Sequence, residues 1–182
     1  MNVGRCLGGR MQDAFISEST YSRAVEFLGT VGLHSRGEIS LERVIDEIKK
    51  HPDSARAGAL AAFIGMVRED PVERGETKVQ YLEYEAFEEV AIKKLQELRN
   101  DLMSKDGIVD ISIHHIVDRL KVGEESLIVA VLGTRRRFVF PVLEQAVERV
   151  KKEVPIWKKE FTSDTAYWVS DASAHGSPKD RR

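Results

Sequence analysis

Two short apolar segments dominate the hydropathy pattern of this chain of 182 residues. One covers Ala57–Val67 and contains two glycines, and the other covers Leu127–Leu132. Both fall well short of the roughly 20 residues that a helix needs to cross a bilayer. Apolar runs of this length are typical of strands in a protein core. We therefore expect a folded domain, not a membrane protein, with buried strands in Gly58–Val67 and Leu127–Leu132.

Helical and strand-like periodicities alternate around these two segments. Apolar residues at helical spacing predict a helix at Leu41–Ile48, after the possible N-cap Ser40, and two longer ones at 87–102 and Phe138–Glu153, the last ended by Val154-Pro155. Alternation predicts further strands at Gln80–Phe87, 109–115, Ile156–Phe161 and Ala166–Val169, and turns at 120–125 and 133–137. The pattern predicts an α+β domain with two main helices on a mixed or mostly antiparallel sheet.

Composition excludes several classes of protein. The formal net charge is -2, whereas a general nucleic-acid coat protein is strongly basic. The single cysteine, Cys6, excludes a disulfide framework and a thiolate metal site, and it fits a cytoplasmic location. We predict a partly flexible N-terminal extension at residues 1–38, one domain at 39–170 and a flexible tail at 171–182. The long loop at Glu69–Lys78 is polar and contains Pro and Gly.

Cationic side chains concentrate near the second long helix. Residues 133–160 hold eight Lys or Arg and four Glu. Arg135, Arg136 and Arg137 precede the predicted helix, where guanidinium groups and backbone N–H groups together favour an anion, although a solvated turn is the alternative. Lys158 and Lys159 face opposite sides of a strand, so one of them approaches the inner face. Burial beside other cations favours the neutral, nucleophilic form of a lysine.

Other polar residues are weaker candidates. Arg68 is the first charge after an apolar run, which places it at a strand end, though a plain strand-terminating charge is the alternative. His114 and His115 are adjacent, so they face opposite sides of a strand and cannot share a metal ion; we expect one to be packed and the other exposed. No nucleophile elbow, P-loop or dinucleotide-binding fingerprint is present.

Several segments together resemble the large, catalytic subunit of molybdopterin synthase, the MoaE family. The matching segments, in order, are Gly58–Arg68, Tyr81–Glu85, His115 with Leu120 and Gly123–Glu124, Thr134–Arg136, and Lys151 with Pro155–Glu160. The order and spacing match over about residues 39–170. The resemblance implies an α/β-hammerhead-like single domain that needs no metal or other cofactor.

The resemblance also implies a reaction. A small ubiquitin-like, MoaD-like carrier subunit brings sulfur as a thiocarboxylate on its C-terminal Gly-Gly tail, which enters a pocket of the large subunit. Two sulfur transfers convert cyclic pyranopterin monophosphate into molybdopterin, whose dithiolene later binds molybdenum or tungsten. The large subunit is implied to be a homodimer within a heterotetramer.

The family's site residues map onto six positions of this sequence. Lys151 matches the key catalytic lysine and Lys158 the second active-site lysine. Phe63 and Arg68 match residues that line the pocket. Arg136 matches an arginine that reaches across the dimer to the pterin phosphate, and Arg135 lies beside it as a second substrate-binding residue.

Two positions depart from the family pattern. Arg135 stands where the family usually has histidine, and a guanidinium cannot shuttle protons near pH 7. Either that histidine only binds anions, or acid and base work passes to Lys151 and Lys158. After His115, Ile116 and Asp118 replace the usual Arg and Gly. One alternative to an enzyme is a non-catalytic module that keeps the groove for the carrier tail. The other is a domain that contacts RNA through the Arg135–Arg137 loop, but such domains usually have an aromatic stacking platform, which this sequence lacks.

Overall fold

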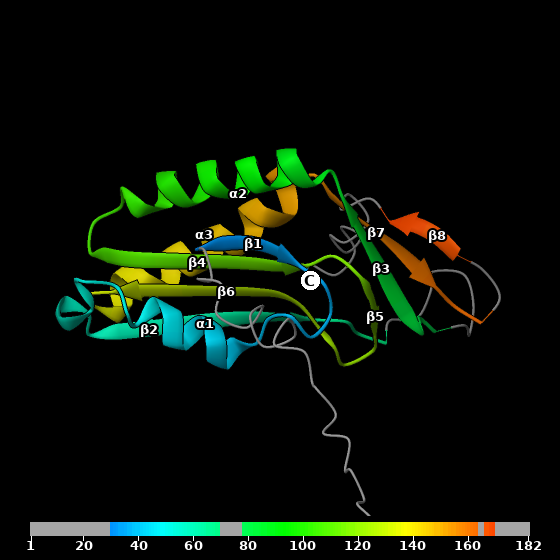
Figure 1. Ribbon diagram of the computed structural model, residues 1–182, viewed down its shortest axis with the longest axis horizontal. Coiled ribbons are helices and arrows are strands. Elements are labelled where there is room, and N and C mark those ends of the chain that lie inside the picture. The colour runs from blue at the N-terminus through cyan, green and yellow to red at the C-terminus, as the bar shows by residue number, and fades with distance from the viewer. Residues whose placement is uncertain (1–29, 70–77, 164–165, 170–182) are drawn as a thin grey trace, which may run out of the picture.

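The described part of the chain forms two sheets and three α-helices. The computed structural model describes residues 30–69, 78–163 and 166–169. The main sheet is covered by helices on both faces, and the second sheet stands at one end of it (Figure 1). The predicted leader at residues 1–20, most of the predicted loop Glu69–Lys78 and the tail at 171–182 lie outside the described residues.

The main sheet has the strand order β1-β4-β6-β2. β1 (Val31–His34) runs parallel to β4 (Ile108–Ile116), which pairs antiparallel with β6 (Glu125–Gly133), and β6 pairs antiparallel with β2 (Ala59–Met66). The prediction of a mixed sheet is therefore confirmed. β2 lies at the edge of the sheet.

Each face of the main sheet has its own hydrophobic core. α2 (Glu88–Met103) and α3 (Arg136–Glu153) cover one face, where they pack on Ile111, Ile113 and the odd-numbered residues Leu127–Val131 of β6. α1 (Leu41–Ile48) covers the other face, where the even-numbered residues of β6 point. Each fully buried Leu or Ile contributes roughly 1.5–3 kcal/mol. The predicted helices are confirmed, and the Ser40 hydroxyl caps α1 by accepting the Arg43 N–H at 3.3 Å.

The second sheet is fully antiparallel, with the order β5-β3-β7-β8. Its strands are β3 (Tyr81–Ala86), β5 (Arg119–Lys121), β7 (Ile156–Phe161) and β8 (Ala166–Val169). α3 ends at Glu153, Val154 is extended, and Pro155 leads directly into β7. The end of α3 is therefore joined to the second sheet by two residues. A single 3₁₀ turn at Ser54–Arg56 precedes β2.

Four sequence expectations differ from the structure. α3 begins at Arg136, not Phe138, because Arg is a good helix former and no helix-breaking residue precedes Pro141. Residues 119–121 form a short strand within the predicted turn region. Most of the segment Ala59–Met66 is half-buried and not buried as expected, because β2 has a neighbour on one side only among the described strands. His114 and His115 are both buried, since helices cover both faces of β4.

β1 lies ahead of the predicted domain boundary at residue 39. It pairs with the full length of the 113–116 segment of β4, and His34 lies 3.0 Å from His114, Nε2 to Nδ1. The main sheet therefore includes residues that the sequence places in the N-terminal extension. The structure describes nothing before residue 30, so the predicted flexibility of the extension stays a prediction.

Gly107 gives the first stability prediction. Its φ is +74°, and a Cβ there would lie 2.8 Å from Cγ of Phe138 and 2.9 Å from Oγ1 of Thr134. We expect Gly107→Ala to lower the free energy of unfolding by about 2 kcal/mol or more, because backbone strain and overpacking add. Gly37, with φ +84° and open space around it, is the matched control, and Gly37→Ala should lower it by about 1 kcal/mol. Urea unfolding measures both, and equal losses would contradict the overpacking.

Candidate active site

A cleft of about 1060 Å³ lies between the two sheets, at the C-terminal end of α3. β2, β3, β4, β6, α3, β7 and β8 contribute to its lining, which comes from six separate stretches of sequence. Its lining includes four of the six predicted site residues, namely Phe63, Arg68, Lys151 and Lys158. The fold therefore brings together side chains that are up to 95 positions apart in the sequence.

Lys151 lies in the last turn of α3, where a cation interacts favourably with the helix macrodipole. Its Nζ is 5.9 Å from the centre of the Phe63 ring, which is within the range of a cation–π contact. Phe63 comes from the edge strand β2 and packs against the helix-covered core. The contact orients the ammonium group along the cleft wall. Lys152, the next residue, also lines the cleft.

Lys158 lines the same cleft as Lys151 but comes from the second sheet. It is half-buried on β7 and pairs across the strands with Tyr84 of β3. Lys159 lies on the other face, with its Nζ 5.2 Å from the Phe161 ring and 5.4 Å from the Trp168 ring. The prediction that one of these neighbouring lysines approaches the inner face is confirmed, and Lys158 is that residue. Arg68, two residues after β2 ends, adds an exposed guanidinium at the cleft.

Arg135 and Arg136 do not line this cleft. Arg135 is the N-cap of α3 and Arg136 its first residue, so they lie at the opposite end of the helix from Lys151. Lys151 lies fifteen positions after Arg136 in the same helix, a distance of roughly 22 Å along the axis. Both arginines are exposed. A cation at a helix N-terminus faces the positive end of the macrodipole, so a bound anion would compensate for this placement.

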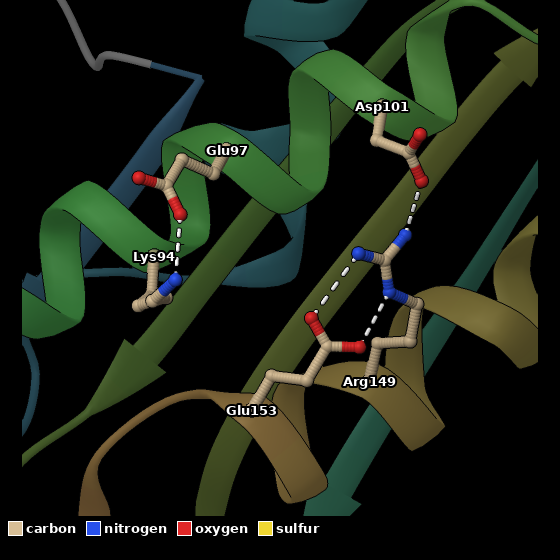
Figure 2. A network of polar contacts seen from close by, with 5 residues as sticks. All are labelled: Lys94, Glu97, Asp101, Arg149 and Glu153. Atoms are coloured by element: carbon tan, nitrogen blue, oxygen red, sulfur yellow. Dashed lines mark hydrogen bonds and ion pairs between the residues drawn. The ribbon is translucent and has the colours of Figure 1, made fainter.

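An ion-pair network behind the cleft neutralises one of its acids. Figure 2 shows Arg149 of α3 between Asp101 of α2 and Glu153 of α3. The Arg149 Nε donates to Glu153 at 2.7 Å, and this hydrogen bond lowers the pKa of the Glu153 carboxyl below its usual value. Glu153 lines the cleft but is already paired. The paired Glu153 carboxylate therefore cancels less of the positive charge of Lys151 and Lys152 than an unpaired carboxylate would.

Sequence reasoning missed the polar residues at the floor of the cleft. His115 of β4 and Ser126 of β6 are both buried and line it. The edge of the His115 ring meets Tyr84, with ring centres 5.0 Å apart. The alternation of Ile111, Ile113 and His115 was the available signal, because it puts the imidazole on the face of β4 that α2 and α3 cover.

The buried histidines predict a loss of stability in mild acid. Burial lowers the pKa of His114 to about 3 and that of His115 to about 4, from an ordinary 6.5. The unfolded chain therefore binds more protons below pH 6.5, and the free energy of unfolding falls as the pH drops toward these values. We expect each histidine to remove roughly 2 kcal/mol between pH 7 and pH 5. Urea unfolding at both pH values tests this, and His115→Gln should weaken the dependence; an unchanged free energy in the wild type would contradict it.

The described residues lack two kinds of feature, a membrane-spanning helix and a metal-binding cluster. No α-helix in residues 30–69, 78–163 and 166–169 is both long and apolar enough to cross a membrane. The same residues contain no group of three or more His, Cys, Asp or Glu side chains arranged to hold a metal ion.

Comparison with known proteins identifies the family. Residues 34–153 match the MoaE protein family. The chain is 37% identical over 125 residues to the molybdopterin synthase catalytic subunit of Pyrococcus abyssi, which covers 69% of this chain and 82% of that protein. It is 35% identical over 133 residues to that of Bacillus subtilis, which covers 73% of this chain and 80% of that protein.

Solved structures agree with the sequence match. The crystal structure of molybdopterin synthase from Staphylococcus aureus aligns with a TM-score of 0.68 and 31% identity, over 78% of this chain and 98% of that one. The complex of subunits 1 and 2 of the molybdopterin-converting factor from Helicobacter pylori aligns with a TM-score of 0.63 over 79% of this chain and 92% of that one, and at 17% identity it shows the fold alone. The chain belongs to the MoaE family, whose curated relatives are catalytic subunits of molybdopterin synthase, an enzyme of molybdenum-cofactor biosynthesis.

Proposed function

We propose that this chain transfers sulfur from a thiocarboxylated carrier protein to cyclic pyranopterin monophosphate in the cleft between its sheets. The observation that supports this most directly is the meeting of Phe63, Arg68, Lys151 and Lys158 around one cleft. These are the positions that match the family's site residues. A thiocarboxylate and a phosphate are both anionic, and cations in a partly water-excluded cleft bind anions strongly.

Lys151 and Lys158 are the proposed catalytic residues. They stand on different elements, the end of α3 and the inner face of β7, so a reacting group between them meets an ammonium on two sides. Preorganised cations of this kind stabilise the negative charge that develops as a thiocarboxylate carbon is attacked or released. Phe63 positions Lys151 through the ring contact, and Arg68 binds an anion at the rim.

The proposed partner is a small ubiquitin-like carrier with a Gly-Gly tail. The fold relative from Helicobacter pylori is a complex of two subunits. Sulfur that arrives on a partner removes the need for a cysteine in the cleft, and the only cysteine in the sequence is Cys6. A cytoplasmic enzyme, a homodimer within a heterotetramer, and no contact with nucleic acid or membrane complete the proposal.

The free edge of β2 supports a two-fold dimer. Among the strands that the structure describes, β2 has one neighbour, β6, and its edge carries small and apolar residues without the lysines or prolines that usually protect an exposed strand. Two copies that pair antiparallel along this edge would form an isologous interface. The start of each β2 would then lie beside the end of the other.

This pairing would bring Arg135 and Arg136 to the cleft of the other protomer. The start of β2 adjoins the start of α3, since the Gly58 N–H donates to the Gly133 carbonyl at 3.0 Å. The end of β2, at Gly65 and Met66, lines the cleft. Antiparallel pairing therefore places one protomer's arginines near its partner's Arg68, where they would bind the substrate phosphate. This accounts for two site residues that lie far from the cleft of their own chain.

The test is reconstitution from purified components. The chain is mixed with a thiocarboxylated carrier and cyclic pyranopterin monophosphate, and molybdopterin is measured as its fluorescent oxidation product. We expect product in proportion to the thiocarboxylate consumed, and none with carrier that ends in an ordinary carboxylate. Carrier binding without product would instead favour the non-catalytic module, with Arg135 marking the lost activity.

A further inference from the structure

The cleft divides its polar groups by type. Its cations Arg68, Lys151 and Lys158 only donate hydrogen bonds. The two buried polar residues of the cleft floor, His115 and Ser126, can also accept hydrogen bonds, and they lie on the neighbouring strands β4 and β6. Nothing in the proposed sulfur transfer uses them so far.

The contacts of His115 fix which ring nitrogen bears the proton. Nδ1 lies 3.0 Å from the backbone oxygen of Ile116, and a carbonyl oxygen only accepts, so Nδ1 is the donor. Burial holds the pKa of His115 at about 4, so the ring is neutral at pH 7 and Nε2 has a free lone pair. Nε2 makes no hydrogen bond with any residue that the structure describes.

Ser126 likewise uses its only side-chain donor within the protein. Its hydroxyl donates to the carbonyl oxygen of Gly65 at 3.2 Å, which leaves the lone pairs of Oγ as acceptors. The two floor residues therefore both present acceptors, while the cations around the cleft present donors. A ligand that matches both regions has an anionic group at one end and N–H groups at the other.

We propose that His115, together with Ser126 in the lining of the same cleft, forms a positioning site that accepts a hydrogen bond from an N–H group of the ligand whose anionic group lies among Arg68, Lys151 and Lys158. This rests on the proposed function. The N–H group comes from the pterin ring of the substrate or from a peptide bond of the carrier's Gly-Gly tail. In either case the hydrogen bond sets how far the ligand enters the cleft, and therefore where its reacting atoms lie relative to Lys151.

His115→Phe and His115→Gln form a matched pair of variants. Phenylalanine keeps a ring against Tyr84 but has no acceptor, whereas the glutamine amide restores an acceptor oxygen. Isothermal calorimetry measures two ligands separately, cyclic pyranopterin monophosphate and a carrier-tail peptide that ends in Gly-Gly. We expect His115→Phe to weaken one of them about tenfold and His115→Gln to restore most of that loss. The ligand that is weakened identifies the source of the N–H group.

Two further measurements separate positioning from a structural role. The ¹⁵N chemical shift of His115 Nε2 should move when that ligand is added to the wild type. In the full assay, His115→Phe should raise KM with little change in kcat if the pterin is the donor. If His115→Phe destabilises the fold, Ser126→Ala and the wild-type ¹⁵N titration supply the test.

Unchanged affinities for both ligands in a folded His115→Phe, or an unmoved Nε2 resonance, would overturn this proposal. Failure of the proposed function looks different, because the wild type would then bind both ligands and make no dithiolene. Equal losses in the Phe and Gln variants would also overturn it, since they would indicate packing and not an acceptor.

Discussion

Lys151→Ala is expected to lower the rate of molybdopterin formation roughly 10²–10³-fold, the usual effect of removing one well-placed charge-stabilising group. Lys151 is exposed on the last turn of α3, so its replacement leaves the core intact and the unfolding midpoint unchanged. Affinity for the carrier should change little. Single-turnover assays with preloaded carrier measure the chemical step separately from carrier binding.

Lys152→Ala is the matched control for this prediction. Lys152 follows Lys151 in the same helical turn, lines the same cleft and carries the same charge. It has no contact with Phe63 comparable to the 5.9 Å approach of Lys151. We expect a loss below about tenfold, from the weaker general field of the cleft. Equal losses in the two variants would contradict a specific role for Lys151 and leave only a cationic surface.

Mixing two inactive variants should restore activity if the arginines act across the dimer. Arg136→Ala and Lys151→Ala are each expected to be nearly inactive alone. A mixed dimer of the two has one site that combines an intact Lys151 with an intact partner Arg136. Random exchange of subunits puts half of the dimers in this mixed form, so about a quarter of the wild-type activity should return.

The alternative arrangement gives a different result in the same experiment. If Arg136 acts on the cleft of its own chain, every site in the mixed dimer lacks one of the two residues, and the mixture stays inactive. Size-exclusion chromatography with differently tagged variants verifies that exchange has occurred. A charged substitution on the free edge of β2, such as Ala62→Lys, should then abolish both the dimer and the restored activity, since Ala62 is exposed there.

Periodicity predicted the elements that are long or central. α2 and α3 follow from apolar residues at helical spacing, and β7 was predicted as a strand whose neighbouring lysines face opposite sides, with Lys158 assigned to the cleft only by the structure. β1 could not be predicted in this way. It has four residues, is half-buried and lies beside a polar, glycine-containing stretch, so pairing with β4 and not local preference decides its structure.

The sequence predicted which residues belong to the site, but not where in the fold they meet. Local sequence shows that Lys151 ends a helix and that Lys158 is in a strand, but only the sheet topology shows that they face one cleft. The same topology separates Arg135 and Arg136 from that cleft. His115 was not predicted as a site residue because a buried histidine and a ligand-binding histidine have the same alternation in sequence, and only the cleft distinguishes them.

The length of α3 fixes the spacing between the two reaction centres of the proposed assembly. Its eighteen residues span roughly 27 Å, with the lysines of one reaction centre at one end and the phosphate-binding arginines of the neighbouring centre at the other. Inserting or deleting a single residue within it would rotate one end by about 100° relative to the other and spoil at least one centre. The length of α3 is therefore more tightly constrained than the identity of the exposed residues between its two ends.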